Sequence, residues 1–168
     1  MRQGKPDIGY IPTDRELVEA MLDFAKVTSD DIVYDLGSGD GRVLIIAAQN
    51  YGARGVGIDI DPERIREANE NILKAGVSNL VEIRQQDLFD CDFSEANVVF
   101  LYLLPHLNLR LRPQLFKQLK PGTRIISHDF YMGDWQPEKK IEIQVPEEAI
   151  IYYWIIPSEI PPEWCAFA

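Results

Sequence analysis

A glycine-rich segment at residues 35–42 constrains the fold of this chain more than any other stretch. It reads Asp-Leu-Gly-Ser-Gly-Asp-Gly-Arg, follows a short β-favouring run at residues 32–34, and precedes a helix-like apolar run at residues 43–48. A strand, a glycine loop and a helix in this order present backbone N–H groups to a ligand at the helix N-terminus. Glycine suits such a loop because a Cβ would obstruct both the tight turn and the approach of the ligand.

The spacing of Gly37, Gly39 and Gly41 indicates the kind of ligand. A dinucleotide fingerprint, G-x-G-x-x-G, would place its third glycine at the position that Arg42 occupies. The pattern here is D-x-G-x-G-x-G, starting at Asp35, and it resembles motif I of class I S-adenosylmethionine (SAM) methyltransferases. A strand-to-helix turn without a ligand is the alternative, but three glycines are more than packing requires.

Length and composition predict one globular domain over residues 1–168, with an extended N-terminal arm at residues 1–13. The longest apolar runs, residues 98–104 and 150–156, are too short to span a bilayer, so we expect no membrane segment. Cys91 and Cys165 lack metal-ligand spacing and are too few for a disulfide framework. We therefore expect a reducing compartment, the cytoplasm, and no metal site.

The net charge is −10, from 17 basic and 27 acidic residues. A surface that follows phosphates needs clustered lysine and arginine. Only short pairs such as Lys139 with Lys140 occur, so we expect no nucleic-acid substrate. An acidic surface favours a cationic partner, although ordinary solubility explains the charge equally well.

The N-terminal arm ends in Tyr10-Ile11-Pro12-Thr13. Thr13 and Glu16 form a capping box ahead of a helix that we expect to end near residue 27. We predict that Tyr10 and Thr13 also face the cofactor. In the alternative interpretation, Thr13 is only the helix N-cap.

Two further strands are predicted to end in acids at the same edge of the sheet as Asp35. Asp59 ends the strand at residues 55–59 and lies 20 residues after Gly39, where a carboxylate can accept both ribose hydroxyls. Asp61 caps the next helix, so the sequence predicts that Asp59 is free for the ligand. Asp87 follows a strand at residues 80–84 and would accept from the adenine amino group, with Leu88 against the ring. A solvated loop aspartate is the alternative for Asp87.

The strongest predicted strand, residues 96–104, is a nearly continuous apolar run of the kind buried on both faces. It ends in Tyr102-Leu103-Leu104-Pro105, where substrate would meet cofactor. Methyltransferases that modify nucleobase amines carry Asn or Asp, then Pro-Pro and an aromatic residue, at this place. The missing polar acceptor argues against base methylation. A helix at residues 109–119 should follow.

The tripeptide Ser127-His128-Asp129 suggests a catalytic triad. Adjacent strand residues point to opposite faces of a sheet, so these three cannot form the relay, and we predict a structural or rim role for His128. The following segment, residues 130–140, is too short for a helix that flanks the sheet. Its Tyr131 and Trp135, with Phe130, either line the substrate entrance or pack in the core.

Strands that alternate with helices, followed by a hairpin at residues 141–156, predict an α/β fold: a mostly parallel seven-strand sheet with one antiparallel strand. The chain also resembles the seven-strand lysine methyltransferases that modify the c-ring protein of ATP synthase and the adenine nucleotide translocase. The shared segments are YIPT at 10–13, DLGSGDGR at 35–42, GVGIDID at 55–61, LYLLP at 101–105, LRP at 111–113, PGTRIISHDF at 121–130 and GDWQP at 133–137.

This resemblance implies a Rossmann-like class I methyltransferase sandwich, SAM as cofactor, and a protein or peptide lysine as methyl acceptor. The predicted catalytic residues are Tyr10, Thr13 and Tyr102, and no residue is evident as a general base. The predicted cofactor-binding residues are Asp35, Gly37, Ser38, Gly39, Gly41, Asp59, Ile60, Asp87 and Leu88. A methyltransferase acting on small-molecule N or O atoms and a non-catalytic SAM-binding protein remain alternatives; Arg42 makes a nicotinamide dehydrogenase the least favoured.

Overall fold

The structure, a computed structural model, describes residues 15–144 and 148–165. The predicted arm, with Tyr10 and Thr13, lies outside these residues. The helices and strands are α1 (Arg15–Phe24), β1 (Ile32–Leu36), α2 (Arg42–Tyr51), β2 (Arg54–Asp59), α3 (Pro62–Ala75), β3 (Val81–Gln85), β4 (Val98–Leu101), α4 (Pro105–Gln118), β5 (Arg124–His128), β6 (Lys139–Ile143), β7 (Ala149–Ile155) and α5 (Pro162–Cys165).

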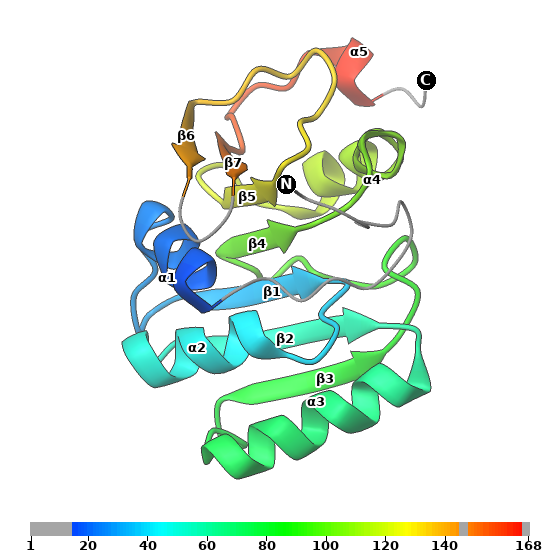
Figure 1. The fold of residues 1–168 in the computed structure, drawn as a ribbon. Coiled ribbons are helices and arrows are strands. Elements are labelled where there is room, and N and C mark those ends of the chain that lie inside the picture. Colours follow the sequence, from blue (N-terminus) through cyan, green and yellow to red (C-terminus); the bar gives the residue numbers. More distant parts are fainter. Residues whose placement is uncertain (1–14, 145–147, 166–168) are drawn as a thin grey trace.

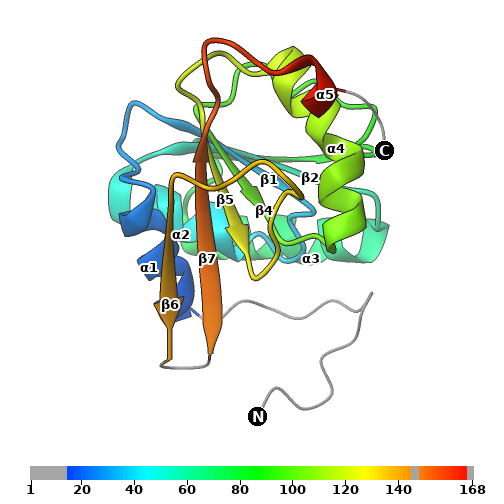
Figure 2. The same ribbon diagram turned by 90° about the horizontal axis from the view of Figure 1, so that it is seen from above.

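The seven strands form one sheet in the order β3-β2-β1-β4-β5-β7-β6 (Figures 1 and 2). Neighbouring strands from β3 to β5 run parallel, and β7 runs antiparallel to both β5 and β6. The predicted α/β fold with a C-terminal antiparallel hairpin is therefore confirmed. The order reverses direction between β1 and β4, and open α/β sheets bind ligands at the carboxyl ends of such strands.

Two apolar clusters cover the two faces of the sheet. One contains the buried side chains of α1 and α2 together with Ile72 of α3, and the other contains those of α4. The central strand β4 contributes Val98 and Phe100 to the first and Val99 and Leu101 to the second, because successive strand residues point to opposite faces. All four side chains are buried, as predicted for this strand.

The predicted Asp61 cap of α3 is confirmed, and both α2 and α3 end at a glycine. Gly52 and Gly76 cap their C-termini with left-handed backbone. The Asp61 carboxylate accepts the backbone N–H of Glu63 at 2.9 Å. Within the described ranges, no helix is both long and apolar enough to cross a lipid bilayer.

The boundary between β4 and α4 was predicted wrongly. The strand ends at Leu101 rather than at residue 104, and α4 begins at Pro105 rather than near residue 109. An apolar run does not distinguish a strand from the entrance of a helix. Pro105 occupies the first turn of α4, where the missing N–H of proline costs nothing.

The loop between β5 and β6 is anchored by Arg112 of α4. This buried guanidinium donates to the carbonyl of Met132 at 3.0 Å and that of Trp164 at 3.1 Å, and it pairs with Asp134. Trp135 is also buried, and its ring packs among those of Phe116, Trp154 and Trp164. Of the two interpretations of Trp135, the structure supports core packing.

Candidate functional site

The strand register gathers the predicted site residues at the carboxyl edge of the sheet. Leu36, the last residue of β1, pairs with Leu101 at the end of β4 and with Ile58, one residue before the end of β2. Gly37, the next residue along, is therefore flanked in register by Asp59 and Tyr102. The same row continues to Gln85 at the end of β3 and to His128 at the end of β5. One edge thus carries the glycine loop, an acid and an aromatic residue.

The glycine loop adopts the backbone that its sequence requires. Gly37, Gly39 and Gly41 have φ values of 89°, 57° and 82°, in the left-handed region that favours glycine. The N–H groups of Gly37 and Ser38 donate to the carbonyl of Ile58 at 2.8 and 3.0 Å, which fixes the loop on β2. The buried Oγ of Ser38 has no hydrogen-bond partner within the described part of the chain. A buried hydroxyl of this kind is suited to a ligand with polar groups.

Asp59 is not free, contrary to the sequence prediction. One carboxylate oxygen accepts the N–H of Gly39 at 2.9 Å, and the other accepts the N–H of Asp61 at 3.0 Å. Asp59 therefore holds the glycine loop and the start of α3 together. Because each carboxylate oxygen can accept more than one hydrogen bond, both can still receive a ribose hydroxyl.

Asp35, at the end of β1, is buried beside the glycine loop. Burial, and then the nearby charges of Asp59 and Asp40, raise the pKa of Asp35 to about 8. A carboxyl group with this pKa is mostly protonated at neutral pH. A cation bound next to it would favour the ionised form, so this edge of the sheet is suited to a positively charged ligand.

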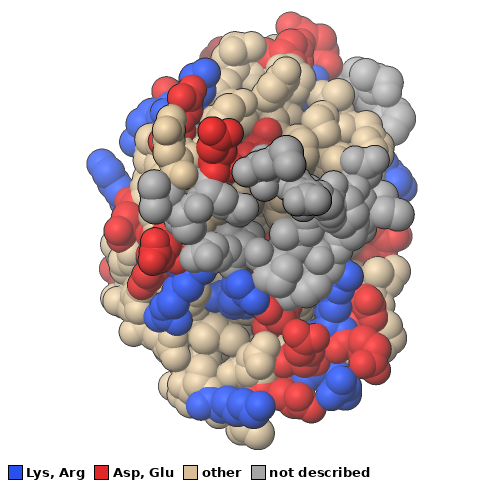
Figure 3. Space-filling model, viewed as in Figure 1, with Lys and Arg blue, Asp and Glu red and all other residues tan. Residues whose placement is uncertain are grey.

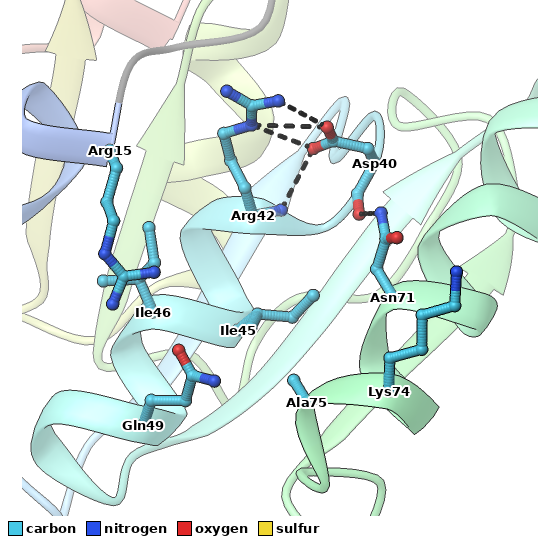
Figure 4. A pocket seen from close by; sticks show the side chains of 9 residues that line it. All are labelled: Arg15, Asp40, Arg42, Ile45, Ile46, Gln49, Asn71, Lys74 and Ala75. Carbon is cyan, nitrogen blue, oxygen red and sulfur yellow. Dashed lines mark hydrogen bonds and ion pairs between the residues drawn. The ribbon is translucent and has the colours of Figure 1, made fainter.

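Asp40 is a residue of the glycine loop that the sequence analysis missed. Its carboxylate pairs with Arg42 at 2.7 Å, and its carbonyl accepts from the side chain of Asn71 at 3.1 Å (Figure 4). The signal that could have identified it is an acid inside the loop with an arginine two residues later. These residues line a cleft of about 440 Å³ that also involves Arg15 and Lys74. Apart from Asp40, the residues that line this cleft come from α1, α2 and α3, and none of them belongs to the row at the carboxyl edge.

Three more of the predicted cofactor-binding residues follow the ends of β2 and β3. Asp87 is exposed, and its carboxylate accepts the N–H of Phe89 at 2.9 Å, as in a loop-capping aspartate. Leu88 is half-buried against the apolar cluster. Ile60 is 65% exposed, and its carbonyl accepts from the Gln85 side chain at 3.4 Å. Cofactor binding by Ile60 and adenine contacts by Asp87 and Leu88 remain predictions.

Aromatic rings dominate the other half of the edge. Tyr102 is half-buried, and its ring stacks on His128 at a centroid distance of 4.3 Å and on Phe130 at 6.1 Å. The hydroxyl of Ser127 donates to the carbonyl of Phe130 rather than to an imidazole nitrogen. The catalytic-triad interpretation is therefore excluded, as predicted. The described residues contain no group of three or more His, Cys, Asp or Glu that could hold a metal ion.

Gly57 of β2 is a second residue that the sequence analysis missed. A Cβ at this position would lie 2.7 Å from the Cβ of Ser38 and 2.7 Å from Ile83. Glycine inside a strand can mark a close backbone approach, which was the available signal. The glycine loop packs on β2 because Gly57 has no side chain.

Gly57→Ala is expected to destabilise the protein by about 1–3 kcal/mol, because the loop must move to admit the methyl group. Urea denaturation measures this change, and titration with SAM should show weaker binding. The matched control is Gly55→Ala in the same strand, whose added Cβ would lie 2.9 Å from the side chain of Leu44 and so disturb the packing of α2 rather than that of the glycine loop. Equal SAM affinity of the two variants would contradict the proposed contact.

The comparisons with known proteins agree with this geometry. Residues 35–139 match the ANTKMT methyltransferase domain. The protein-lysine N-methyltransferase of Saccharolobus islandicus (strain REY15A) is 47% identical over 140 residues, which are 83% of this chain and 87% of that protein. The adenine nucleotide translocase lysine N-methyltransferase of Mus musculus is 30% identical over 131 residues, 77% of this chain but only 56% of that protein.

A solved structure is similar over nearly its whole length. It is the crystal structure of an RNA methyltransferase from Salinibacter ruber in complex with S-adenosyl-L-homocysteine. The TM-score is 0.87 and the identity 53%, covering 90% of this chain and 97% of that one. The sequence resemblance is thereby confirmed, and the chain belongs to the ANTKMT methyltransferase family.

Proposed function

We propose that this methyltransferase transfers a methyl group from SAM to lysine side chains of a protein. The site fits SAM because a buried hydroxyl, that of Ser38, and a carboxylate that can accept ribose hydroxyls, that of Asp59, lie at one edge of the sheet. A third group, the buried acid Asp35, is suited to a cation. The protein-lysine acceptor is supported by the names of the archaeal and mouse relatives.

The observation that carries the proposal is the group of aromatic rings at the carboxyl ends of β4 and β5. Past β4 the chain continues with Tyr102, Leu103 and Leu104, and the ring of Tyr102 lies among those of His128 and Phe130. An apolar, aromatic entrance lowers the pKa of a lysine amine by desolvation, so that the amine can lose its proton. Aromatic faces also attract a cationic side chain.

In this proposal the glycine loop with Asp59 binds the cofactor, and the aromatic residues around Tyr102 bind the acceptor. When bound, SAM supplies an electrophilic methyl group that an amine attacks in line with the departing sulfur. Asp59 and the glycine loop would hold the nucleoside, and Tyr102 would orient the acceptor amine. Alignment of this kind contributes about 7–11 kcal/mol to a bimolecular reaction. Tyr10 and Thr13 remain predicted members of the site.

The description of the Salinibacter structure raises RNA as a second candidate acceptor. Two observations weigh against it for this chain. The net charge is −10, and on the face shown in Figure 3 the described lysines and arginines form separate groups between acidic ones. Phosphate tracking needs a continuous basic surface. In addition, no Asn or Asp directly follows β4 to hold a nucleobase amine.

The test is incubation of the purified protein with methyl-labelled SAM and a lysate of the source organism. We expect label that protease removes and ribonuclease leaves, with methyl-lysine in the acid hydrolysate. Label that ribonuclease removes would replace the proposal with RNA methylation, and label confined to small molecules would indicate a small-molecule acceptor. SAM binding without transfer would indicate a non-catalytic binding protein. The proposed cytoplasmic location rests on the sequence, whose two cysteines are too few for a disulfide framework.

A further inference from the structure

Asp129, directly after β5, has an unusual backbone. Its φ is 72°, and Lys26 is the one other non-glycine residue with positive φ within the described ranges. Lys26 follows the C-terminus of α1, where left-handed backbone is common. No helix ends at Asp129. A non-glycine residue held in this conformation is a reason to look for a function.

β7 holds Asp129 with two hydrogen bonds. Its N–H donates to the carbonyl of Ile150 at 2.7 Å, and its carboxylate Oδ1 accepts the N–H of Ile150 at 3.0 Å. The second carboxylate oxygen, Oδ2, lies 3.7 Å from Nε2 of His128. The left-handed backbone thus places a carboxylate beside a buried imidazole.

The imidazole of His128 lies between this carboxylate and Tyr102, the residue proposed to orient the acceptor amine. The rings of His128 and Tyr102 are nearly parallel, with an interplanar angle of 24° and a centroid distance of 4.3 Å. Tyr102 also stacks on Phe130, whose carbonyl accepts the hydroxyl of Ser127. The orientation of the Tyr102 ring therefore depends on the plane of His128.

A purely structural role would not require an acid at position 129. Asparagine could accept the Ile150 N–H equally well and tolerates left-handed backbone, and glycine adopts it without strain. What neither residue supplies is a negative charge next to an imidazole. At 3.7 Å the carboxylate lies beyond hydrogen-bond distance of the imidazole, so it acts on the ring through its charge, which favours the orientation that turns Nε2 toward it.

We infer that Asp129 is a positioning residue for methyl transfer: its carboxylate orients His128, which holds the ring of Tyr102 against the acceptor amine. This inference rests on the proposed function, because it assigns the acceptor to the Tyr102 end of the row. Neither Asp129 nor His128 belongs to the glycine loop or to the other residues proposed to bind SAM. Their loss should therefore slow transfer and leave SAM binding intact.

The test compares Asp129→Asn, which retains an acceptor for the Ile150 N–H, with His128→Phe, which retains a flat ring. Initial rates are measured with methyl-labelled SAM at saturation and increasing amounts of source-organism lysate, and SAM affinity is measured by calorimetry. For both variants we expect the maximal rate to fall about 10- to 100-fold. SAM affinity and the amount of lysate that gives half of the maximal rate should stay within about twofold of the wild-type values.

The matched control is Glu142→Gln, which removes an exposed carboxylate from β6 opposite Ile150. Its rate should equal that of the wild type. An active wild type with an equally active Asp129→Asn overturns the inference and leaves the proposed function standing. A wild type that binds SAM and labels no protein overturns the proposed function, and the inference with it. If Asp129→Asn does not fold, full activity of His128→Phe overturns the inference by itself.

Discussion

Asp35→Asn is expected to make the folded protein more stable than the wild type at alkaline pH. In the folded chain, burial and the charges of Asp59 and Asp40 raise the pKa of Asp35 to about 8, well above the ordinary value of 3.8. Between these two values the folded state holds a proton that the unfolded state has lost. Stability from this group is therefore complete below about pH 4 and is lost as the pH rises through about 8.

The expected difference is large. At about pH 9 the wild type bears the full cost of the buried charge, on the order of 5 kcal/mol, which the amide avoids. At about pH 4 the two proteins should be almost equally stable. Urea denaturation of both proteins across this range measures the difference, and subtraction removes the titration of all other groups. Parallel stability curves for the two proteins would show that Asp35 titrates normally.

The same substitution should weaken SAM binding. A cation beside Asp35 favours the carboxylate, so binding at neutral pH should release a proton from this group. Wild-type affinity is then expected to increase with pH up to about 8, by at most about tenfold per pH unit, and to remain constant above that. Asp35→Asn should bind more weakly and without this dependence. Calorimetry in buffers of different ionisation enthalpy detects the released proton.

The features that the sequence predicted are those that local chemistry determines. The glycine spacing at residues 37–41, the Asp61 cap and the apolar run of β4 each reflect a local preference. Together they predicted the α/β fold and the location of the site at the carboxyl edge of the sheet. The family resemblance pointed to Tyr102, and the register places it next to the glycine loop.

What the sequence did not predict depends on contacts between distant residues. Asp59 looked unoccupied because its partner, the N–H of Gly39, is 20 residues away. Trp135 had two interpretations because nothing local shows that it packs among other aromatic rings. The stack of Tyr102 on His128 arises from the pairing of β4 with β5, which a single strand does not reveal.

Asp59→Ala is expected to reduce SAM affinity at least about 100-fold, because two effects act together. The variant loses the carboxylate that would accept the ribose hydroxyls, and it also releases the glycine loop from the start of α3. Two backbone N–H groups, those of Gly39 and Asp61, lose their acceptor, which should lower stability by about 1–3 kcal/mol. Calorimetry measures the affinity, and urea denaturation measures the stability.

Asp61→Ala is the matched control because it removes a neighbouring carboxylate that caps α3 and does not hold the glycine loop. Loss of this cap should cost about 1 kcal/mol of stability and leave SAM affinity nearly unchanged. If both variants lose affinity equally, the cause is the start of α3 rather than the Asp59 carboxylate. If Asp59→Ala binds SAM as the wild type does, the ribose contact does not exist and the loop anchor contributes nothing to affinity, which would contradict cofactor binding at this edge of the sheet.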